Sequence, residues 1–312
     1  MQLNLANANI NFLGQRRMAL SVSAILLVIS ILLLVFRGLN FGIDFTGGTL
    51  IEVGYPEEVE LLEVRERLED GGFDGASVQY FGTSRDVLIR LAPREGEDSA
   101  ELSEEVLTQL RGGSQRDVEM RRVEFVGPQV GDELREQGGL AMLYALLGIL
   151  IYVALRFEWR FSLGAVAALV HDVTLTLGVF SLLWLEFDLS VLAAVLAVIG
   201  YSLNDTIVVY DRIRENFRRL RKEATEQVMN KSVNQSLDRT IMTSVTTLLV
   251  LFCLYLLGGA VIQNFALALI IGVLVGTYSS IYVAAALALV MGVDRGVMLP
   301  VKKEGEELDD RP

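Results

Sequence analysis

Long segments that carry almost no charge constrain the fold of this chain more than any other feature. These segments are residues 18–36, 138–155, 161–185, 189–210 and 240–293, and no segment contains more than two charged or histidine side chains. About 20 apolar residues in a helix are enough to cross the hydrocarbon core of a bilayer. The last segment is far too long for one crossing, and the pair Gly258 and Gly259 divides it into two. The sequence therefore predicts a membrane α-helical bundle with six transmembrane helices.

Positive charge is unevenly distributed among the connections between these helices. Lysine and arginine are enriched in the cytoplasmic loops of membrane proteins. Here they precede the first helix, separate the second from the third, and follow the fourth and the sixth: Arg16, Arg17, Arg156, Arg160, Arg212, Arg214, Arg218, Arg219, Arg221, Lys222, Lys302 and Lys303. Both termini are therefore expected in the cytoplasm. The expected parts of the chain are a cytoplasmic N-terminus with the first helix at 1–37, an outer domain at 38–137, helices two to six at 138–293 with a cytoplasmic loop at 211–239, and a cytoplasmic tail at 294–312.

Residues 38–137 have the composition of a separate, water-exposed domain. They carry 23 acidic and 10 basic residues, a net charge of −13, and the rest of the chain is close to neutral. This acidic balance argues against nucleic acid as a partner. Apolar alternation and helix-like runs predict a strand–helix–strand–strand–helix–strand order over 48–55, 57–70, 76–81, 86–92, 99–111 and 117–125. That order is typical of a ferredoxin-like α+β domain, expected here on the periplasmic side between helices 1 and 2.

Motifs of the common enzyme classes are absent from the sequence. It contains no G-x-x-x-x-G-K-[ST] phosphate-binding loop, no G-x-S-x-G nucleophile motif and no H-E-x-x-H zinc motif. One histidine and one cysteine cannot build a typical structural zinc site. We expect a chain that is not an enzyme and that needs neither a cofactor nor a metal.

Asp205 is the only charged residue of the predicted fourth helix. A charge at membrane depth costs about 2.5–3.5 kcal/mol on insertion scales, so such a residue is a functional candidate. Burial favours the neutral carboxyl, which is therefore expected to exchange protons near neutral pH. The adjacent Asn204, with Tyr201 and Ser202, is a candidate for holding water or tuning this carboxyl. The structural alternative is a hydrogen bond that only packs two helices together.

Four other polar residues are candidates for the same proton-conduction site, with Arg239 ranked beside Asp205 and the other three below it. Arg239 is expected to open the fifth helix at a depth similar to that of Asp205, as a counter-ion or, alternatively, as an interfacial anchor. His171 and Asp172 lie near the middle of the third helix. Neighbouring side chains on a helix point about 100° apart, so these two are not expected to share one face closely. A proton relay and a packing contact are about equally reasonable for them, whereas close helix packing is favoured for the hydroxyl of Thr243.

Several motifs, taken in order, resemble the SecF branch of the SecD/SecF family. They are F-G-I-D-F-T-G-G-T at 41–49, R-F-E at 156–158, H-D at 171–172, G-Y-S-L-N-D-T at 200–206, Y-D-R-I-R-E-N at 210–216, S-L-D-R-T at 236–240 and G-T-Y-S-S at 276–280. The resemblance covers nearly the whole chain, up to about residue 300.

The resemblance implies a location, partners and a mechanism. Members of this family pair with SecD in a twelve-helix assembly of the bacterial inner membrane, similar to the resistance-nodulation-division transporters. That assembly binds the SecYEG translocon, often with YajC, and uses the proton gradient to promote the late translocation of preproteins. The family's proton-conducting aspartate and arginine match Asp205 and Arg239. Membrane lipid is a further expected partner.

Two other functions stay open at this point. One is a passive scaffold that links SecD to SecYEG. The other is a proton-coupled exporter of small molecules from the same superfamily, which would want a larger outer region than about 100 residues to hold its substrate.

Overall fold

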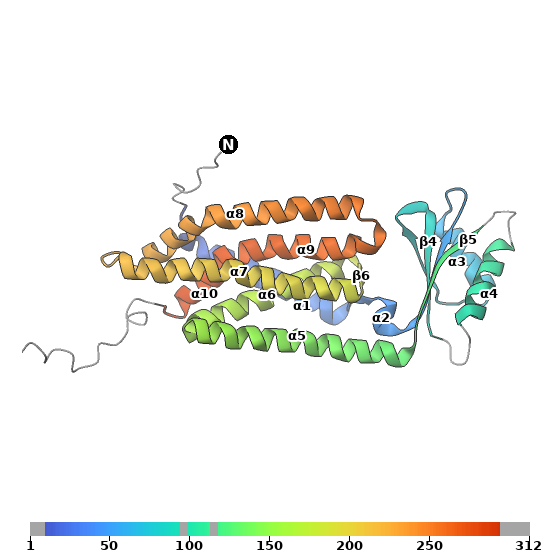
Figure 1. The fold of residues 1–312 in the computed structure, drawn as a ribbon, viewed down its shortest axis with the longest axis horizontal. Coiled ribbons are helices and arrows are strands. Elements are labelled where there is room, and N and C mark those ends of the chain that lie inside the picture. The colour runs from blue at the N-terminus through green and yellow to red at the C-terminus, as the bar shows by residue number, and fades with distance from the viewer. Residues whose placement is uncertain (1–9, 94–98, 113–117, 294–312) are drawn as a thin grey trace, which may run out of the picture.

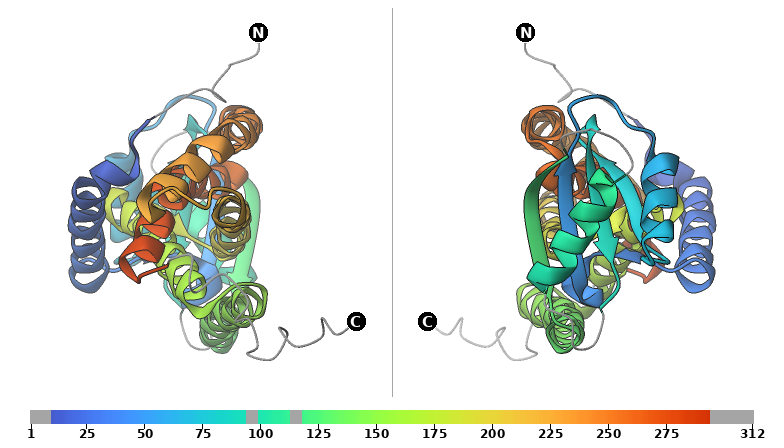
Figure 2. Two further views of the ribbon diagram at one scale, coloured as in Figure 1. Left: turned by 90° about the vertical axis from the view of Figure 1, so that its left-hand side faces the viewer. Right: turned by 90° about the vertical axis from the view of Figure 1, so that its right-hand side faces the viewer.

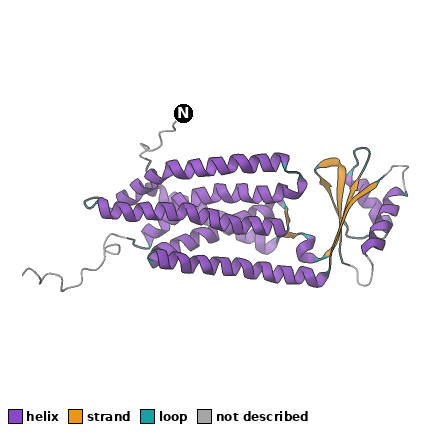
Figure 3. Ribbon diagram, in the orientation of Figure 1, coloured by secondary structure: helices purple, strands orange, loops and turns teal. Residues whose placement is uncertain are grey.

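The computed structural model describes residues 10–93, 99–112 and 118–293. A bundle of long helices stands beside a smaller unit in which helices cover one face of a sheet (Figure 1). Nearly all strands lie in the smaller unit, whereas helices occur in both parts (Figure 3). The predicted tail at 294–312 lies outside the described residues.

Six helical segments of the described residues are long and apolar enough to cross a membrane. Five are single helices: α1 (Arg16–Phe36), α5 (Pro128–Arg156), α6 (Trp159–Leu183), α7 (Leu189–Arg219) and α8 (Thr225–Leu257). The sixth consists of α9 (Ala260–Tyr278), the π-helix η3 (Ser279–Ala284) and α10 (Ala285–Val290). The prediction of six transmembrane helices is confirmed, including the division at Gly258 and Gly259. The chain is a multi-pass membrane protein.

The six helices differ in how much of their surface the bundle covers. In their most apolar stretches, 56% of α6 and 50% of α7 are buried, against 17% of α1, 11% of α5 and 17% of α8. The end-on views place α1, α5 and α8 at the periphery (Figure 2). Helices α6 and α7 are therefore the most buried spans, and α1, α5 and α8 present apolar faces that suit lipid or another membrane protein.

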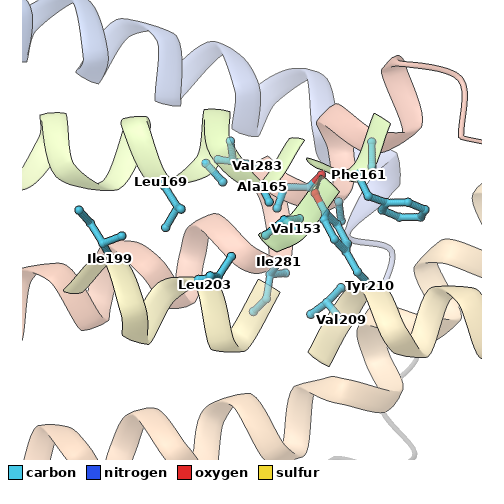
Figure 4. Close-up of a cluster of buried hydrophobic side chains, with 14 of the residues drawn as sticks. Val153, Phe161, Ala165, Leu169, Ile199, Leu203, Val209, Tyr210, Ile281 and Val283 are labelled. Atoms are coloured by element: carbon cyan, nitrogen blue, oxygen red, sulfur yellow. Dashed lines mark hydrogen bonds between the residues drawn. The ribbon is translucent and has the colours of Figure 1, made fainter. Parts of the chain in front are cut away.

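Small residues and one tyrosine bring the central helices together. Tyr210 of α7 is fully buried, and its ring packs edge-on against Phe161 of α6 with 4.6 Å between the ring centroids. Its hydroxyl donates to the carbonyl oxygen of Ala284 at 3.1 Å, which satisfies the polar end of a buried aromatic side chain. Figure 4 shows this cluster, in which Tyr210 lies against Phe161 and close to Ala165. The contact ties α7 to the sixth span at the end of its π-helical turn.

The smaller unit is built from β2 (Gly48–Gly54), α3 (Leu61–Asp70), β3 (Ser77–Phe81), β4 (Thr83–Leu91), α4 (Ser99–Arg111) and β5 (Glu119–Val126). These elements follow the predicted order closely. All neighbouring strands are antiparallel, in the spatial order β3-β4-β2-β5. Alternate strand residues such as Ile51 and Ile89 point toward one face, where they meet Leu68 and Val106 of the helices in a core of their own.

The predicted outer segment, 38–137, includes at both ends residues that pack with or belong to elements of the bundle. Residues Asn40–Phe41 form a short strand, β1, that pairs in parallel with β6 (Glu186–Phe187), in the connection between α6 and α7. The next turn, α2 (Ile43–Thr46), packs against α5. At the other end, α5 already begins at Pro128. The charges of residues 132–136 indicate where the helix leaves the apolar region, not where the helix begins.

The segment 211–239, predicted as a cytoplasmic loop, is mostly helical. Helix α7 continues to Arg219 and α8 starts at Thr225, so the connection is only 220–224. The two helical extensions pack against each other. The side-chain amide of Asn216 donates to Ser232 Oγ and to Gln235 Oε1, both at 2.8 Å. Because the polar run of α7 forms a paired helix outside the apolar region, its charges were mistaken for a loop.

Candidate functional site

Asp205 is held between three helices in the centre of the bundle. Its side chain is buried, with 8% of the residue exposed. The hydroxyl of Thr240 on α8 donates to Oδ1 at 2.5 Å, and the hydroxyl of Ser280 in the π-helix donates to Oδ2 at 2.5 Å. The carboxyl group therefore connects α7 to α8 and to the sixth span. A change in its charge acts on all three helices at once.

A second buried polar group, on α6, contacts α7 about one helical turn before Asp205. Asp172 Oδ1 contacts His171 Nδ1 at 2.9 Å, and Asp172 Oδ2 accepts from Ser202 Oγ at 2.5 Å. Both His171 and Asp172 are almost completely buried. The expectation that they do not share one face closely is wrong, because two short side chains 100° apart can still bend toward each other. Ser202 and Asp205, three residues apart, lie on the same side of α7.

The other ring nitrogen of the histidine has no partner. His171 Nε2 is buried and makes no hydrogen bond within the described residues, and the same is true of Ser279 Oγ. The histidine ring stacks near Tyr278, at 6.4 Å between centroids, and the Tyr278 hydroxyl contacts Ser23 Oγ at 3.1 Å. Buried polar atoms are nearly always hydrogen-bonded, so an unpartnered one beside an ionisable pair is a feature of the candidate site.

A π-helix interrupts the sixth span beside Asp205. Residues Ser279–Ala284 form it, between α9 and α10. Single π-helical turns within α-helices are rare and occur often at functional sites. The extra residue per turn shifts the helix face, and Ser280 is thereby brought against the Asp205 carboxyl. The π-helix and the buried Asp205 carboxyl are therefore in direct contact through Ser280.

Arg239 lies near Asp205 without pairing with it. It is an exposed residue within α8, 14 residues after the start of the helix, so the expectation that it opens the helix is wrong. No ion pair within 4.0 Å joins it to Asp205. Its side chain lines a hollow of about 220 Å³ with Asp211, Arg212 and Glu215. The next residue, Thr240, contacts the carboxyl instead.

Two predicted site residues lie away from the buried carboxyl. Asn204 is exposed on the outer side of α7, although it precedes Asp205 in the chain. Thr243 is exposed on α8, and its hydroxyl donates to the carbonyl oxygens of Arg239 and Thr240 in its own helix. Within this chain, then, neither residue contacts the proton-site candidate.

The outer unit is fastened to the bundle next to the start of α7. Arg90 of β4 forms an ion pair with Glu186 of β6, and Gln79 of β3 donates to the same carboxylate at 3.1 Å. Asp44 of α2 accepts the backbone N–H of Leu189 at 3.0 Å, beside the Asp188 carboxylate that caps α7. The helix that carries Asp205 therefore begins inside the junction with the outer unit.

Comparisons with known proteins agree with the sequence motifs. The family model "Protein export membrane protein SecD/SecF, C-terminal" matches residues 106–294, and the model "SecD/SecF GG Motif" matches residues 32–55. The chain belongs to the SecD/SecF family. Its relatives in this family include the protein translocase subunit SecF of Vibrio alginolyticus, 50% identical over 100% of this chain and 99% of the relative. The SecF subunit of Pseudomonas aeruginosa is 48% identical over 99% of this chain and 100% of the relative.

A solved structure of the family is similar over most of this chain. It is the crystal structure of SecDF, a translocon-associated membrane protein, from Thermus thermophilus. The TM-score is 0.84 and the identity is 40%, over 93% of this chain. Only 39% of the SecDF chain is covered, so this SecD/SecF-family chain corresponds to a part of that longer protein.

The family's GG motif has a clear structural reason here. Gly47 and Gly48 have φ angles of 69° and 121°, which L side chains rarely adopt. A Cβ on Gly48 would lie 2.3 Å from the carbonyl oxygen of Leu91, and one on Gly47 would lie 2.9 Å from Cα of Pro128. Both close approaches are to backbone, which cannot rotate away. The pair turns the chain from α2 into β2 where α5 passes.

Sequence reasoning found the acids of the site but missed their partners. Thr240 and Ser280 hold Asp205, and Ser202 holds Asp172. All three belong to short motifs that the sequence analysis quoted, S-L-D-R-T, G-T-Y-S-S and G-Y-S-L-N-D-T. A hydroxyl within a family motif was the available signal.

Proposed function

We propose that this chain is a SecF-like subunit that uses the proton gradient to promote the late translocation of preproteins across the bacterial inner membrane. Its relatives are named protein translocase subunits, and a structural relative is described as translocon-associated. The single observation that carries the proton role is Asp205, a buried carboxyl within a membrane helix that receives hydroxyls from two other helices. Ionisable groups inside membrane bundles mark proton and ion pathways.

The proposed step is the protonation of Asp205 by a proton that enters from the outside. An ionised carboxylate attracts both hydroxyl donors and the more distant Arg239. Neutralisation weakens these three attractions, and α8 and the sixth span then repack against α7. One charge that moves through a potential of 100 mV releases about 2.3 kcal/mol, and about 1.4 kcal/mol changes a population tenfold. One proton is therefore enough to bias a two-state bundle.

The outer unit would carry this motion out of the membrane. We propose that it is a periplasmic ferredoxin-like domain between helices 1 and 2, a proposal that its strand order and its two helices support. The Arg90–Glu186 pair and the Asp44–Leu189 hydrogen bond lie where α7 begins. Displacement of α7 would therefore move the sheet through these two contacts.

SecD is the proposed partner within the membrane. The peripheral helices leave apolar faces uncovered, and Asn204 and Thr243 are exposed on the bundle surface. A second set of six helices packed there would bring both residues to a protein interface. The SecYEG translocon, YajC and the preprotein complete the proposed assembly. A passive scaffold and a small-molecule exporter remain the competing functions.

The test of proton coupling is uptake by reconstituted vesicles. The chain is purified with SecD, inserted into vesicles that contain a pH-sensitive dye, and exposed to an imposed proton gradient. We expect the dye signal to change several times faster than in vesicles that contain an unrelated membrane protein. Equal rates in the two preparations would favour the scaffold.

Topology is predicted by the placement of the lysines and arginines. A reporter enzyme that is active only outside the cytoplasm is inserted at Gly75, in an exposed turn between α3 and β3. The second fusion is at Lys222, in the connection between α7 and α8. We expect activity at Gly75 and none at Lys222. The reverse pattern would show that the proposed orientation is inverted.

A further inference from the structure

Arginines line a hollow at the end of the bundle that is rich in positive charge. It has a volume of about 340 Å³ and lies between the end of α5 and the last turns of α7. Its lining residues are Arg156, Asp211, Arg214, Glu215, Arg218 and Arg219. Four guanidinium groups face two carboxylates, which leaves an excess of two positive charges. This hollow is separate from the Asp205 site.

The two carboxylates are already shared among arginines. Asp211 pairs with Arg156 at 3.0 Å and with Arg214 at 3.8 Å. Glu215 pairs with Arg219 at 2.9 Å and with Arg212, which lies outside the lining, at 2.7 Å. Arg218 makes no ion pair with any other described residue. Each guanidinium has five N–H donors, so many donors remain for an anion.

An aromatic ring holds two of these arginines in place. The guanidinium carbons of Arg156 and Arg214 lie 5.2 Å and 5.3 Å from the centroid of Phe157. Phe157 itself is buried, and Arg214 also donates to the carbonyl oxygen of Arg156 at 3.3 Å. Arginines that are ordered before binding lose less entropy when a ligand arrives. This end of the hollow is therefore a preformed site and not a set of mobile surface charges.

The position of the hollow fits the boundary between lipid tails and headgroups. Leu155, directly before Arg156, is 85% exposed, and Ile151 and Trp159 are exposed as well. Exposed apolar residues on a membrane helix contact acyl chains, and tryptophan is enriched at the headgroup level. The apolar surface of α5 thus ends where the arginine-lined hollow begins.

We propose that the hollow binds the phosphate group of an anionic phospholipid whose acyl chains lie along α5. Guanidinium forks match the oxygens of a phosphate group, and basic pockets at the ends of transmembrane helices bind lipid headgroups. A free phosphate ion offers the same oxygens but no acyl chains for the apolar surface beside the hollow. The inference uses the proposed topology only to assign the site to the inner leaflet.

The test is lipid binding by the full chain in a neutral detergent, read by native mass spectrometry. Phosphatidylglycerol, phosphatidylcholine and inorganic phosphate are titrated separately. The test variant is Arg218→Gln with Arg219→Gln. The control is Arg221→Gln with Lys222→Gln, which removes the same charge from the neighbouring connection outside the lining. We expect phosphatidylglycerol to bind at least about tenfold more tightly than phosphatidylcholine, and the test variant to lose about tenfold while the control keeps its affinity.

Three results would overturn the proposal. They are equal binding of the two lipids, equal loss in the test and control variants, or inorganic phosphate that displaces the lipid at comparable concentrations. The last result would identify a site for soluble anions. If the double variant unfolds, Arg218→Gln alone serves instead, because Arg218 is exposed. Lipid binding is measured without export, so its failure and a failure of the proton-driven function are distinguishable.

Discussion

Asp205→Asn is expected to reduce proton-dependent export to the level of cells that lack the chain. Asparagine has nearly the size of aspartate, and its carbonyl oxygen still accepts a hydrogen bond from Thr240 or Ser280. The substitution removes the group that gains and loses a proton, and little else. Precursor processing is measured in cells depleted of the native protein, and co-purification with SecD reports whether the complex still assembles.

The matched control is Asp238→Asn, which removes one negative charge from α8 near the same end of the bundle. Asp238 is only half-buried and receives no hydroxyl of the Asp205 site, so export should remain close to normal. Arg239→Lys should have a smaller effect than Asp205→Asn, because lysine keeps the positive charge; some loss is expected if the guanidinium fork pairs with the carboxylate in the other state of the bundle. Normal export with Asp205→Asn would favour the scaffold function. Loss of SecD co-purification would show that the carboxyl holds the complex together instead.

Gly48→Ala is expected to destabilise the junction between the outer unit and the bundle by about 3 kcal/mol or more. Two causes combine. A φ of 121° is strained for alanine, and the new Cβ would lie 2.3 Å from the Leu91 carbonyl oxygen. That oxygen belongs to β4, a central strand of the sheet, and Leu91 is paired with Thr49 of β2, so its backbone has little room to move. Thermal unfolding of the purified full chain and its abundance in the membrane measure the effect.

Gly72→Ala separates the two causes. Gly72 also has a left-handed φ, 79°, but a Cβ there would meet nothing within 4 Å. Its substitution should cost only about 1–2 kcal/mol, which is the backbone preference alone. If Gly48→Ala were no worse than Gly72→Ala, the close approach to Leu91 would have no energetic role. The need for glycine would then be purely conformational.

The membrane helices could be predicted because the bilayer imposes a simple rule on composition. Runs such as 18–36 and 161–185 differ sharply from their surroundings, and each became a helix within a few residues of its predicted limits. The ends outside the apolar region could not be predicted in the same way. Helix α7 ends at Arg219 and α8 begins at Thr225, both beyond the apolar segments. The hydrogen bonds of Asn216 pair these two helical extensions. A contact between distant residues decides that, and local composition does not contain it.

The functional site shows the same division. Asp205 was found because it is the only charge in a long apolar helix. Thr240 and Ser280 were not, since many hydroxyls occur in the last two spans and only packing selects the two that reach the carboxyl. The contact between His171 and Asp172 was missed for a different reason. Helical phase gives the direction in which a side chain leaves the backbone, whereas rotamers decide where its end lies.

The π-helix at Ser279–Ala284 gives the sixth span one residue per turn more than an α-helix has, and we expect it to allow a second backbone register. In an α-helix each residue advances by about 100°, so a π-turn that closed to α-helical bonding would rotate one side of the span by about that angle. Helix α9 is packed along α7 and α8, whereas α10 has only six residues. The shorter piece packs mainly against α6, so we expect it to turn more readily than α9. Ser280 lies in this π-helix. The hydrogen bond that it donates to Asp205 would therefore also oppose rotation of the helix.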